Sequence, residues 1–265
     1  MGVEGKVTLV VGSATGMGRE TVIRLVKGGA TVIAFDILGD KLEELKSELS
    51  DAPGSMEPYA GDVTDKEKIK GCIGHIKDTY GTLDNLVYVA GALDMMTPAH
   101  AVDDELWDYI MDVNVNSAFR FVREALPLLK DHEGRSANIV IVSSLGGLVG
   151  SSSGTAYITS KHAVLGLARN LAWTYKENNI HTNAVNPGSF KTAIMDNQRL
   201  RWPDRPPLHP EGVPKYYKGG ANVLNGGTML GEPVEIANAI MFLLSDEAGF
   251  INGAEITVDG GWGSF

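Results

Sequence analysis

The chain has 265 residues, of which 43% are hydrophobic and 21% charged, so it can bury the core of one large α/β domain. Its formal net charge of -10 excludes nucleic acid and anionic membrane surfaces as partners, because both select for clustered lysines and arginines. No window approaches the roughly 18 uninterrupted apolar residues that a transmembrane helix needs.

The chain starts with a short polar segment that leads directly into an apolar run, without a signal peptide, so we expect a cytoplasmic protein. Cys72 is the single cysteine, which excludes an intrachain disulfide, and its place in an expected helix favours a packing role over a reactive one. The histidines are scattered rather than paired at ligand spacing, so we expect no metal site.

Apolar runs of strand length alternate with amphipathic segments of helix length, which is typical of a parallel sheet covered on both faces. The first run, Lys6–Val11, ends in a turn that carries Gly12, Gly16 and Gly18 and opens a helix to about Lys27. Glycines let the backbone approach a pyrophosphate closely, and a helix N-terminus offers unpaired N–H groups and a positive dipole end. The sequence therefore predicts a phosphate-binding turn.

The second expected strand, Ala30–Phe35, ends in Asp36 about twenty residues beyond this turn, where a carboxylate can accept hydrogen bonds from a ribose. A strand-end Asp can also be a simple helix cap. If Asp36 binds the ribose, NADP would place its 2′-phosphate against this carboxylate, which would cost several kcal/mol of binding free energy. Neither Thr15 nor Ile37 supplies a compensating cation, so we expect NAD rather than NADP.

The middle of the chain continues the alternation. Thr64 and Asp65 are alternative N-caps for a helix that runs through Tyr80. The other expected elements here are a helix over Asp40–Leu49, a strand over Met56–Ala60 and a strand over Leu83–Gly91.

A long helix is expected from Asp103 to Leu129, and it carries Asn114, with Asn116 nearby. The next strand, Asn138–Ser143, brings Ser144 to the carboxyl edge of the sheet, where open α/β sheets bind their ligands. Ser143 competes for this role, and a strand-end serine is also a common turn residue.

Tyr157 and Lys161 lie four residues apart in an amphipathic helix, so they lie on one face of it, one above the other. A free tyrosine has a pKa of about 10, so its use as a base near pH 7 requires about 4 kcal/mol of preference for the phenolate. A fixed cation nearby supplies part of that preference. The alternative to a catalytic pair is a surface helix that carries Tyr and Lys at a common spacing without a role in chemistry.

The sixth strand, Ile180–Asn186, ends in the stiff turn Pro187-Gly188. Residues 193–232 then carry five prolines and many aromatic and apolar side chains, a composition that indicates a substrate lid rather than a solvated excursion. The side chains that we expect to cover a substrate are Trp202, Tyr216, Tyr217, Leu224 and Met229, with Met95 and Met96 on the opposite wall. A helix over Pro233–Leu244 and a strand from Glu255 to Gly261 close the chain.

These motifs together resemble the short-chain dehydrogenase/reductase family over nearly the whole chain: GxxxGxG after the first strand, Ser144 thirteen residues before Tyr157, YxxxK, and Pro187-Gly188. The resemblance implies a single α/β domain over residues 1–265, a doubly wound parallel Rossmann sheet with strand order 3-2-1-4-5-6-7. It also implies a catalytic set of Asn114, Ser144, Tyr157 and Lys161, in which Asn114 holds a water that relays protons to Lys161.

The resemblance further implies the contacts of the NAD cofactor. The turn, strand ends and loops that would hold it contribute Gly12, Thr15, Gly16, Met17, Gly18, Asp36, Ile37, Asp62, Val63, Ala90, Gly91, Tyr157, Lys161, Pro187, Gly188, Phe190 and Thr192. Two positions depart from the family pattern. Val11 stands where a Thr is usual, and Tyr88-Val89 replaces the Asn-Asn pair that ties the fourth strand to its neighbours, which leaves the bonding of this strand open.

The resemblance is greatest to bacterial NAD-dependent hydroxysteroid dehydrogenases, which act on steroid or bile-acid hydroxyls, and the apolar lid fits a large, flat, apolar substrate. Alternatives within the family are a dehydrogenase of a cyclic alcohol, diol or sugar and a 3-oxoacyl-thioester reductase, against which Asp36 and the acidic charge both count. An alternative of another class is a non-enzymatic dinucleotide sensor. Relatives assemble as D2 homotetramers, so we expect one here.

Overall fold

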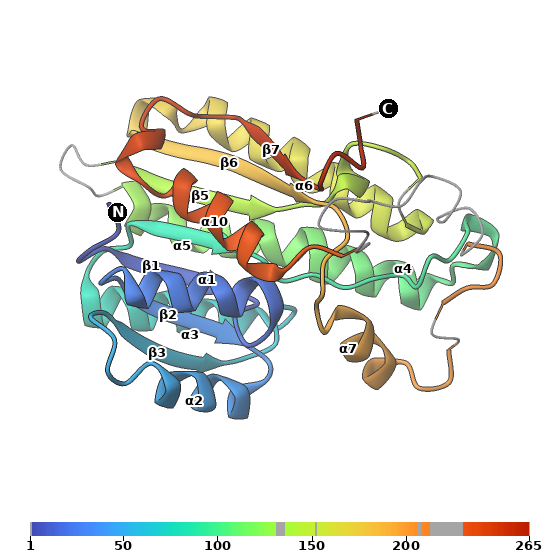
Figure 1. Cartoon of the computed structure of the whole chain (residues 1–265), viewed down its shortest axis with the longest axis horizontal. Helices are drawn as coiled ribbons and strands as arrows, with labels where there is room; N and C mark the ends of the chain where they lie inside the picture. Colours follow the sequence, from blue (N-terminus) through green and yellow to red (C-terminus); the bar gives the residue numbers. More distant parts are fainter. Residues whose placement is uncertain (1, 131–135, 152, 206–207, 213–229, 265) are drawn as a thin grey trace.

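Seven parallel strands form one sheet in the order β3-β2-β1-β4-β5-β6-β7, as expected from the sequence (Figure 1). The structure is a computed structural model that describes residues 2–130, 136–151, 153–205, 208–212 and 230–264. Its strands are β1 (Val7–Val11), β2 (Thr31–Asp36), β3 (Ser55–Ala60), β4 (Asn85–Tyr88), β5 (Ala137–Val142), β6 (Ile180–Pro187) and β7 (Glu255–Val258).

Helices connect successive parallel strands, as in a doubly wound fold. The α-helices are α1 (Gly16–Lys27), α2 (Gly39–Glu48), α3 (Lys66–Tyr80), α4 (Asp104–Met111), α5 (Ser117–Lys130), α6 (Thr155–Thr174), α7 (Ile194–Arg201) and α10 (Pro233–Leu243). The shorter helical turns are η1 (Ala99–Ala101), η2 (Asp112–Asn116), η3 (Leu145–Gly147), η4 (Lys176–Asn178) and η5 (Asp246–Ala248). No helix among the described residues is long and apolar enough to cross a membrane.

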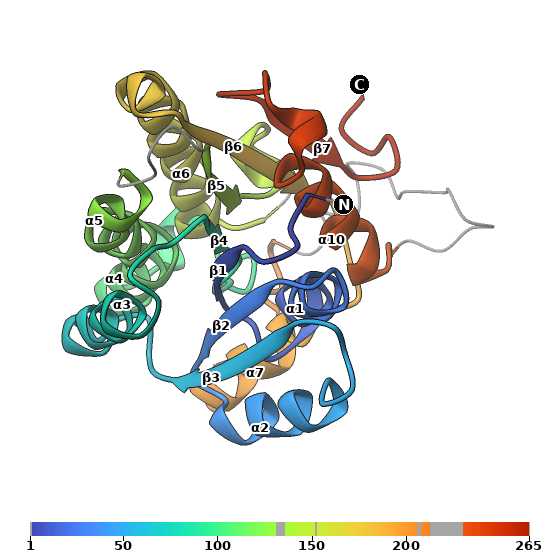
Figure 2. The same cartoon turned by 90° about the vertical axis from the view of Figure 1, so that its left-hand side faces the viewer.

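The helices cover both faces of the sheet, so the strands are apolar on both sides (Figure 2). Helices α3, α5 and α6 pack on one face, where Phe35 of β2 meets Phe121 of α5 edge to face at 5.0 Å. Helices α1, α2 and α10 pack on the other, around residues such as Val32 and Leu42. Cys72 is fully buried in the first of these cores, which confirms its packing role.

The long helix expected from Asp103 to Leu129 is interrupted by the π-helical turn η2, which contains Asn114. The carbonyl oxygen of Val113 accepts hydrogen bonds from the Tyr88 hydroxyl at 2.7 Å and from the Ser117 hydroxyl at 2.5 Å. These side-chain donors compete with the α-helical ladder, which accounts for the local change to wider i→i+5 bonding. Periodicity alone does not reveal such a turn.

Strand β4 is shorter than expected, because it ends at Tyr88 instead of Gly91. Two sets of polar contacts hold this strand in place. Asn85 donates to the Thr8 hydroxyl at 3.0 Å and accepts from Asn138 at 3.0 Å, which joins β4 to both neighbouring strands. Tyr88 ties the end of β4 to η2 and α5 through Val113 and Ser117.

The segment expected to be a lid, residues 193–232, contains the short helix α7, which the sequence did not indicate. Figure 1 shows α7 beyond the edge of the sheet toward which the strands point. Tyr216, Tyr217, Leu224 and Met229 lie outside the described residues.

The helix through Tyr80 is capped by Asp65, whose carboxylate accepts the N–H groups of Glu67 and Lys68. This bonding decides between Thr64 and Asp65, the two expected caps.

Candidate active site

A cavity of about 730 Å³ opens at the carboxyl ends of the strands. It is lined by every residue that the sequence assigned to catalysis or to the cofactor except Gly18 and Asn114. The sheet therefore brings together loops that are distant in the sequence, as the topology of an open α/β sheet requires.

The phosphate-binding turn has the geometry that its glycines predict. Gly12 and Gly16 have positive φ angles of 84° and 54°, which side chains rarely tolerate. Gly18 has a packing role, because a Cβ there would overlap the carbonyl oxygen of Gly12, while its contact with the cofactor stays a prediction. It allows α1 to pack closely on the turn. The side chain of Thr15, the N-cap residue of α1, makes no capping hydrogen bond among the described residues, and the first residues of this helix line the cavity.

Two backbone N–H groups fix the carboxylate of Asp36 at the end of β2. Its Oδ2 accepts the N–H of Ala14 at 2.9 Å, and its Oδ1 accepts the N–H of Leu38 at 3.0 Å. The carboxylate is therefore held between the glycine-rich turn and the segment after β2. Each oxygen keeps a second lone pair for a ligand hydroxyl.

The two candidate serines at the end of β5 have different hydrogen bonds. Ser143 donates its hydroxyl proton to the carbonyl of Lys161 at 2.9 Å, so it holds β5 against α6. Ser144 accepts the N–H of Gly146 at 3.0 Å, and among the described residues no acceptor takes its hydroxyl proton. This geometry agrees with the choice of Ser144 from its spacing to Tyr157.

Tyr157 and Lys161 lie on consecutive turns of α6 and both line the cavity. The Nζ of Lys161 lies 5.6 Å from the centre of the Tyr157 ring and donates to the carbonyl of Val142 at 3.2 Å. Burial lowers the pKa of the Lys161 ammonium from 10.5 to about 8. The side chain thus remains mainly a cation at neutral pH, close to the phenol.

Asn114 is buried behind the cavity wall rather than in it. Its side chain accepts the N–H of Ala92 at 2.8 Å and donates to the carbonyl of Ala92 at 3.0 Å and to the hydroxyl of Ser160 at 2.8 Å. A Cβ on Gly91 would lie 3.4 Å from the Nζ of Lys161 and 3.5 Å from the Oδ1 of Asn114. Asn114 therefore binds the loop beside Lys161, while its relay of protons through water stays a prediction.

The turn after β6 also reaches the cavity. Pro187, Gly188, Phe190 and Thr192 line it, and Thr192 packs against Gly16 of the phosphate-binding turn. Phe190 forms a parallel bridge with Gly231, which anchors the far end of the lid segment to this turn. The two ends of residues 193–232 therefore both lie at the cavity.

The sequence reasoning missed several apolar residues of the wall. Met95 and Met96 line the cavity as expected, whereas Trp202 does not. The other apolar members come from several loops and helices that are distant from one another in the sequence. The apolar residues missed are Leu38, Val89, Leu93, Tyr109, Val113, Val142, Leu145, Ala193, Ile194, Met195, Leu208, Leu230 and Trp262. Trp262 directly follows the expected last strand, which ends at Gly261.

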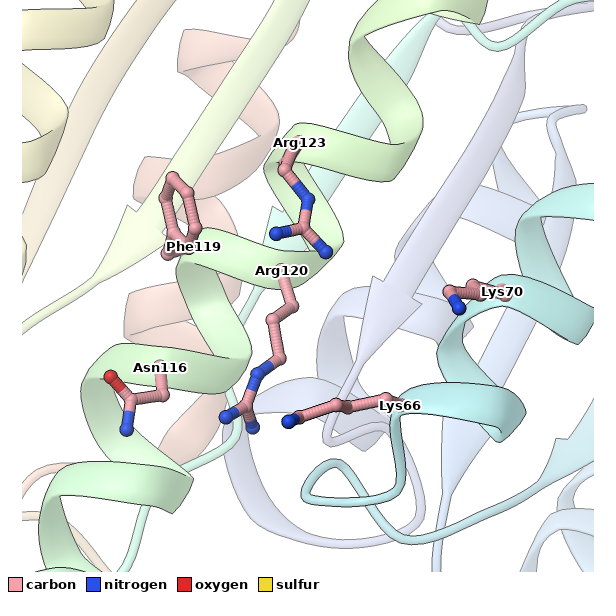
Figure 3. A pocket seen from close by; sticks show the side chains of 6 residues that line it. All are labelled: Lys66, Lys70, Asn116, Phe119, Arg120 and Arg123. Atoms are coloured by element: carbon pink, nitrogen blue, oxygen red, sulfur yellow. The ribbon is translucent and has the colours of Figure 1, made fainter.

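A second hollow, of about 440 Å³, lies between α3 and α5. Figure 3 shows Lys66 and Lys70 on α3 facing Arg120 and Arg123 on α5. Three of these cations already contact carboxylates: Arg120 with Asp112 at 2.8 Å, Lys70 with Glu67 at 2.9 Å, and Arg123 with Glu124 at 2.7 Å. The hollow contains none of the residues assigned to chemistry. Within the described part of the chain, no three His, Cys, Asp or Glu side chains are grouped to hold a metal ion.

Comparison with known proteins identifies the family. A family model described as short chain dehydrogenase matches residues 6–202. A 3β-hydroxysteroid dehydrogenase 2 of Eggerthella lenta is 34% identical over 261 residues, which are 98% of this chain and 96% of that protein. The 3-oxoacyl-[acyl-carrier-protein] reductase FabG of Thermotoga maritima is 33% identical over 98% of this chain and 99% of its own.

A solved structure agrees in fold. The 3-ketoacyl-(acyl-carrier-protein) reductase of Brucella melitensis, determined with NADH, superposes with a TM-score of 0.83 at 25% identity and covers 98% of this chain and 99% of its own.

Proposed function

The chain belongs to the short-chain dehydrogenase family and is an oxidoreductase acting on CH–OH, and we propose that it uses NAD to interconvert a hydroxysteroid or bile-acid alcohol and the corresponding ketone. The observation that carries this proposal is the convergence of Ser144, Tyr157 and Lys161 on one cavity whose walls include many apolar side chains. The similarity to a 3β-hydroxysteroid dehydrogenase supports the substrate class.

The residues present fit a nicotinamide dinucleotide. The start of α1 offers N–H groups without a side-chain cap, and Gly12 and Gly16 give the backbone the close approach that a pyrophosphate needs. When bound, the cofactor accepts hydride from the alcohol or donates it to the ketone.

Asp36 supports NAD over NADP. Its carboxylate is held by the N–H groups of Ala14 and Leu38, so it cannot easily turn away from a 2′-phosphate. Ile37, which follows it, is exposed and apolar, so it cannot neutralise a phosphate. Two hydroxyls of a ribose would instead donate to the free lone pairs of Asp36.

The chemistry of the alcohol is divided among three side chains. Tyr157, as the phenolate, takes the proton of the substrate hydroxyl in the oxidative direction and returns it in the reductive direction. Ser144 donates its free hydroxyl proton to the substrate oxygen as a carbonyl forms. The Lys161 cation, 5.6 Å from the Tyr157 ring, favours the phenolate.

The walls beyond these groups support a large apolar substrate. Met95, Met96 and Leu93 come from the loop after β4, and Ile194 and Met195 come from α7. Methionine side chains adapt to flat, irregular apolar surfaces. A sugar would instead require a wall rich in amide and carboxylate groups.

We propose a homotetramer as the assembled form. Large apolar side chains are exposed on two separate regions: Phe119 and Trp173 on α5 and α6, and Phe242 and Phe250 on α10 and the segment before β7. Self-complementary burial of each region by a two-fold axis would generate D2 symmetry.

The test of the proposed function is an assay of NADH formation with a panel of bile acids and steroids that differ at the 3, 7 and 12 hydroxyls. Butanediols, sugars, cyclic alcohols and a 3-oxoacyl thioester with NADH or NADPH serve as comparisons. We expect efficient turnover of at least one steroid hydroxyl. Efficient turnover of sugars, diols or the thioester without any steroid would overturn the substrate class, and the thioester result would favour the oxoacyl reductase.

A further inference from the structure

We propose that Asp94, in the loop after β4, is a positioning residue that fixes the first turn of α6, and with it Tyr157, to the methionine wall of the cavity. This inference rests on the proposed function for its kinetic test. Asp94 lies outside the motifs that identify the family.

The carboxylate of Asp94 is fully buried and accepts backbone N–H groups from two segments. Its Oδ2 accepts the N–H of Tyr157 at 3.0 Å, and its Oδ1 accepts the N–H of Met96 at 3.2 Å. The backbone N–H groups of Gly154 and Ala156 also stabilise its charged form. One side chain therefore links the backbone of the catalytic tyrosine with the backbone of the substrate wall.

Helix α6 needs this external acceptor. Its N-cap is Gly154, which has no side chain to bind the N–H groups of the first turn. A Cβ on Gly154 would overlap both carboxylate oxygens of Asp94, so the glycine makes the close approach possible. Thr155 adds a second tie by donating its N–H to the carbonyl of Thr97 at 3.0 Å.

The other side of Asp94 holds an unusual backbone. Met95 and Met96 have positive φ angles of 55° and 60°, a left-handed conformation that is rare for non-glycine residues and is retained only where the surroundings enforce it. The carbonyl of Asp94 accepts both the N–H of Thr97, at 3.1 Å, and its hydroxyl. These bonds close the turn that directs the two methionines into the cavity.

The negative charge of Asp94 is matched by the helix rather than by a cation. Among the described residues no Lys, Arg or His forms an ion pair with it. Burial raises the pKa of Asp94, and the backbone N–H groups of Tyr157, Met96, Gly154 and Ala156 offset only part of this rise. The positive end of the α6 dipole thus stabilises the carboxylate where it also determines the position of Tyr157.

The experiment compares Asp94→Asn and Asp94→Ala with the wild type in steroid oxidation, NADH affinity and urea unfolding. Asp65→Asn is the matched control, because Asp65 also binds two backbone N–H groups at the start of a helix, but that helix is α3 and not the helix of Tyr157. We expect kcat to fall by about 10²-fold for Asp94→Ala, because a small misplacement of a catalytic group has that effect. Asp94→Asn keeps one acceptor oxygen, so its kcat should lie between those of Asp94→Ala and the wild type. The NADH affinity should be unchanged in both variants.

A second measurement, amide hydrogen exchange over residues 155–157, does not depend on the substrate. Faster exchange in Asp94→Asn than in Asp65→Asn supports the proposal even if the wild type turns over no steroid, in which case the proposed function alone fails. Wild-type kcat in Asp94→Asn, an equal kcat loss in Asp65→Asn, or unchanged exchange over residues 155–157 would overturn it. If Asp94→Ala does not fold, Asp94→Asn carries the test.

Discussion

The Nζ of Lys161 lies 5.6 Å from the centre of the Tyr157 ring, one helical turn along α6, and is buried between β5 and the cavity. Burial lowers the pKa of this lysine, and the same burial keeps its charge unscreened beside the phenol. The buried Lys161 cation therefore lowers the free energy of unfolding and at the same time favours the phenolate of Tyr157.

The first prediction follows from the linkage between this pKa and stability. The pKa of Lys161 falls from 10.5 in the unfolded chain to about 8 in the folded protein, so the folded state binds fewer protons between these values. Below about pH 8 the folded protein bears the full cost of the buried cation, and above about pH 10.5 it bears none. The free energy of unfolding of the cofactor-free protein should therefore rise with pH across this window, relative to Lys161→Met.

Urea unfolding of both proteins from pH 7 to 10 measures this difference. The gain should be on the order of 3 kcal/mol over the full window. A difference between the two proteins that stays constant with pH would contradict the lowered pKa.

The second prediction concerns Asp36. Its carboxylate, held by Ala14 and Leu38, should make catalytic efficiency with NAD at least about tenfold higher than with NADP, since like-charge contact is costly. Asp36→Ala should narrow the gap by removing the repulsion, without reversing it, because the substitution adds no cation. Steady-state kinetics with both cofactors check this, and equal efficiencies in the wild type would refute it.

The third prediction concerns the buried contacts of the Tyr88 hydroxyl with Val113 and Ser117. Tyr88→Phe should lower the free energy of unfolding by about 1–2 kcal/mol, because the carbonyl of Val113 and the hydroxyl of Ser117 lose a buried partner. Tyr80→Phe is the control, since it removes a bond of similar length to Glu57 at a partly exposed site. An equal decrease in the free energy of unfolding in both variants would show that the buried hydrogen bond of Tyr88 stabilises the fold no more than the partly exposed bond of Tyr80.

The fourth prediction concerns assembly. Light scattering at micromolar concentration should give the mass of a tetramer, and Trp173→Asp and Phe250→Asp should each reduce it to a dimer by placing a charge in one of the two apolar regions. Lys41→Glu on the exposed face of α2 should leave the mass unchanged. A monomeric wild type would refute the assembly.

Much of the fold and of the site follows from local sequence signals. The order of apolar runs predicts the seven-stranded sheet, because parallel strands joined by helices have few allowed arrangements. The glycine spacing, Asp36 and the Tyr157–Lys161 pair identify the cavity, because each needs only neighbours in the sequence or a known family spacing.

The contacts that the sequence does not reveal are those between distant segments. Asp94 bonds to Tyr157 across 63 positions, and neither residue carries a pattern that pairs them. The π-helical turn at Asn114 arises from Tyr88, which lies on another element, so the helical periodicity around it looks continuous. Gly18 has a glycine-motif position, but only the overlap with Gly12 shows that it serves packing.

The most direct test of the central claim is the rate of NADH formation by Tyr157→Phe with the steroid that the wild type oxidises best. The substitution keeps the ring and removes only the proton carrier. We therefore expect turnover to fall by about 10³-fold or more, within the range for loss of a general base, while NADH affinity changes little. Turnover within about tenfold of the wild type would contradict the assignment of Tyr157 and move the acid–base role to another group.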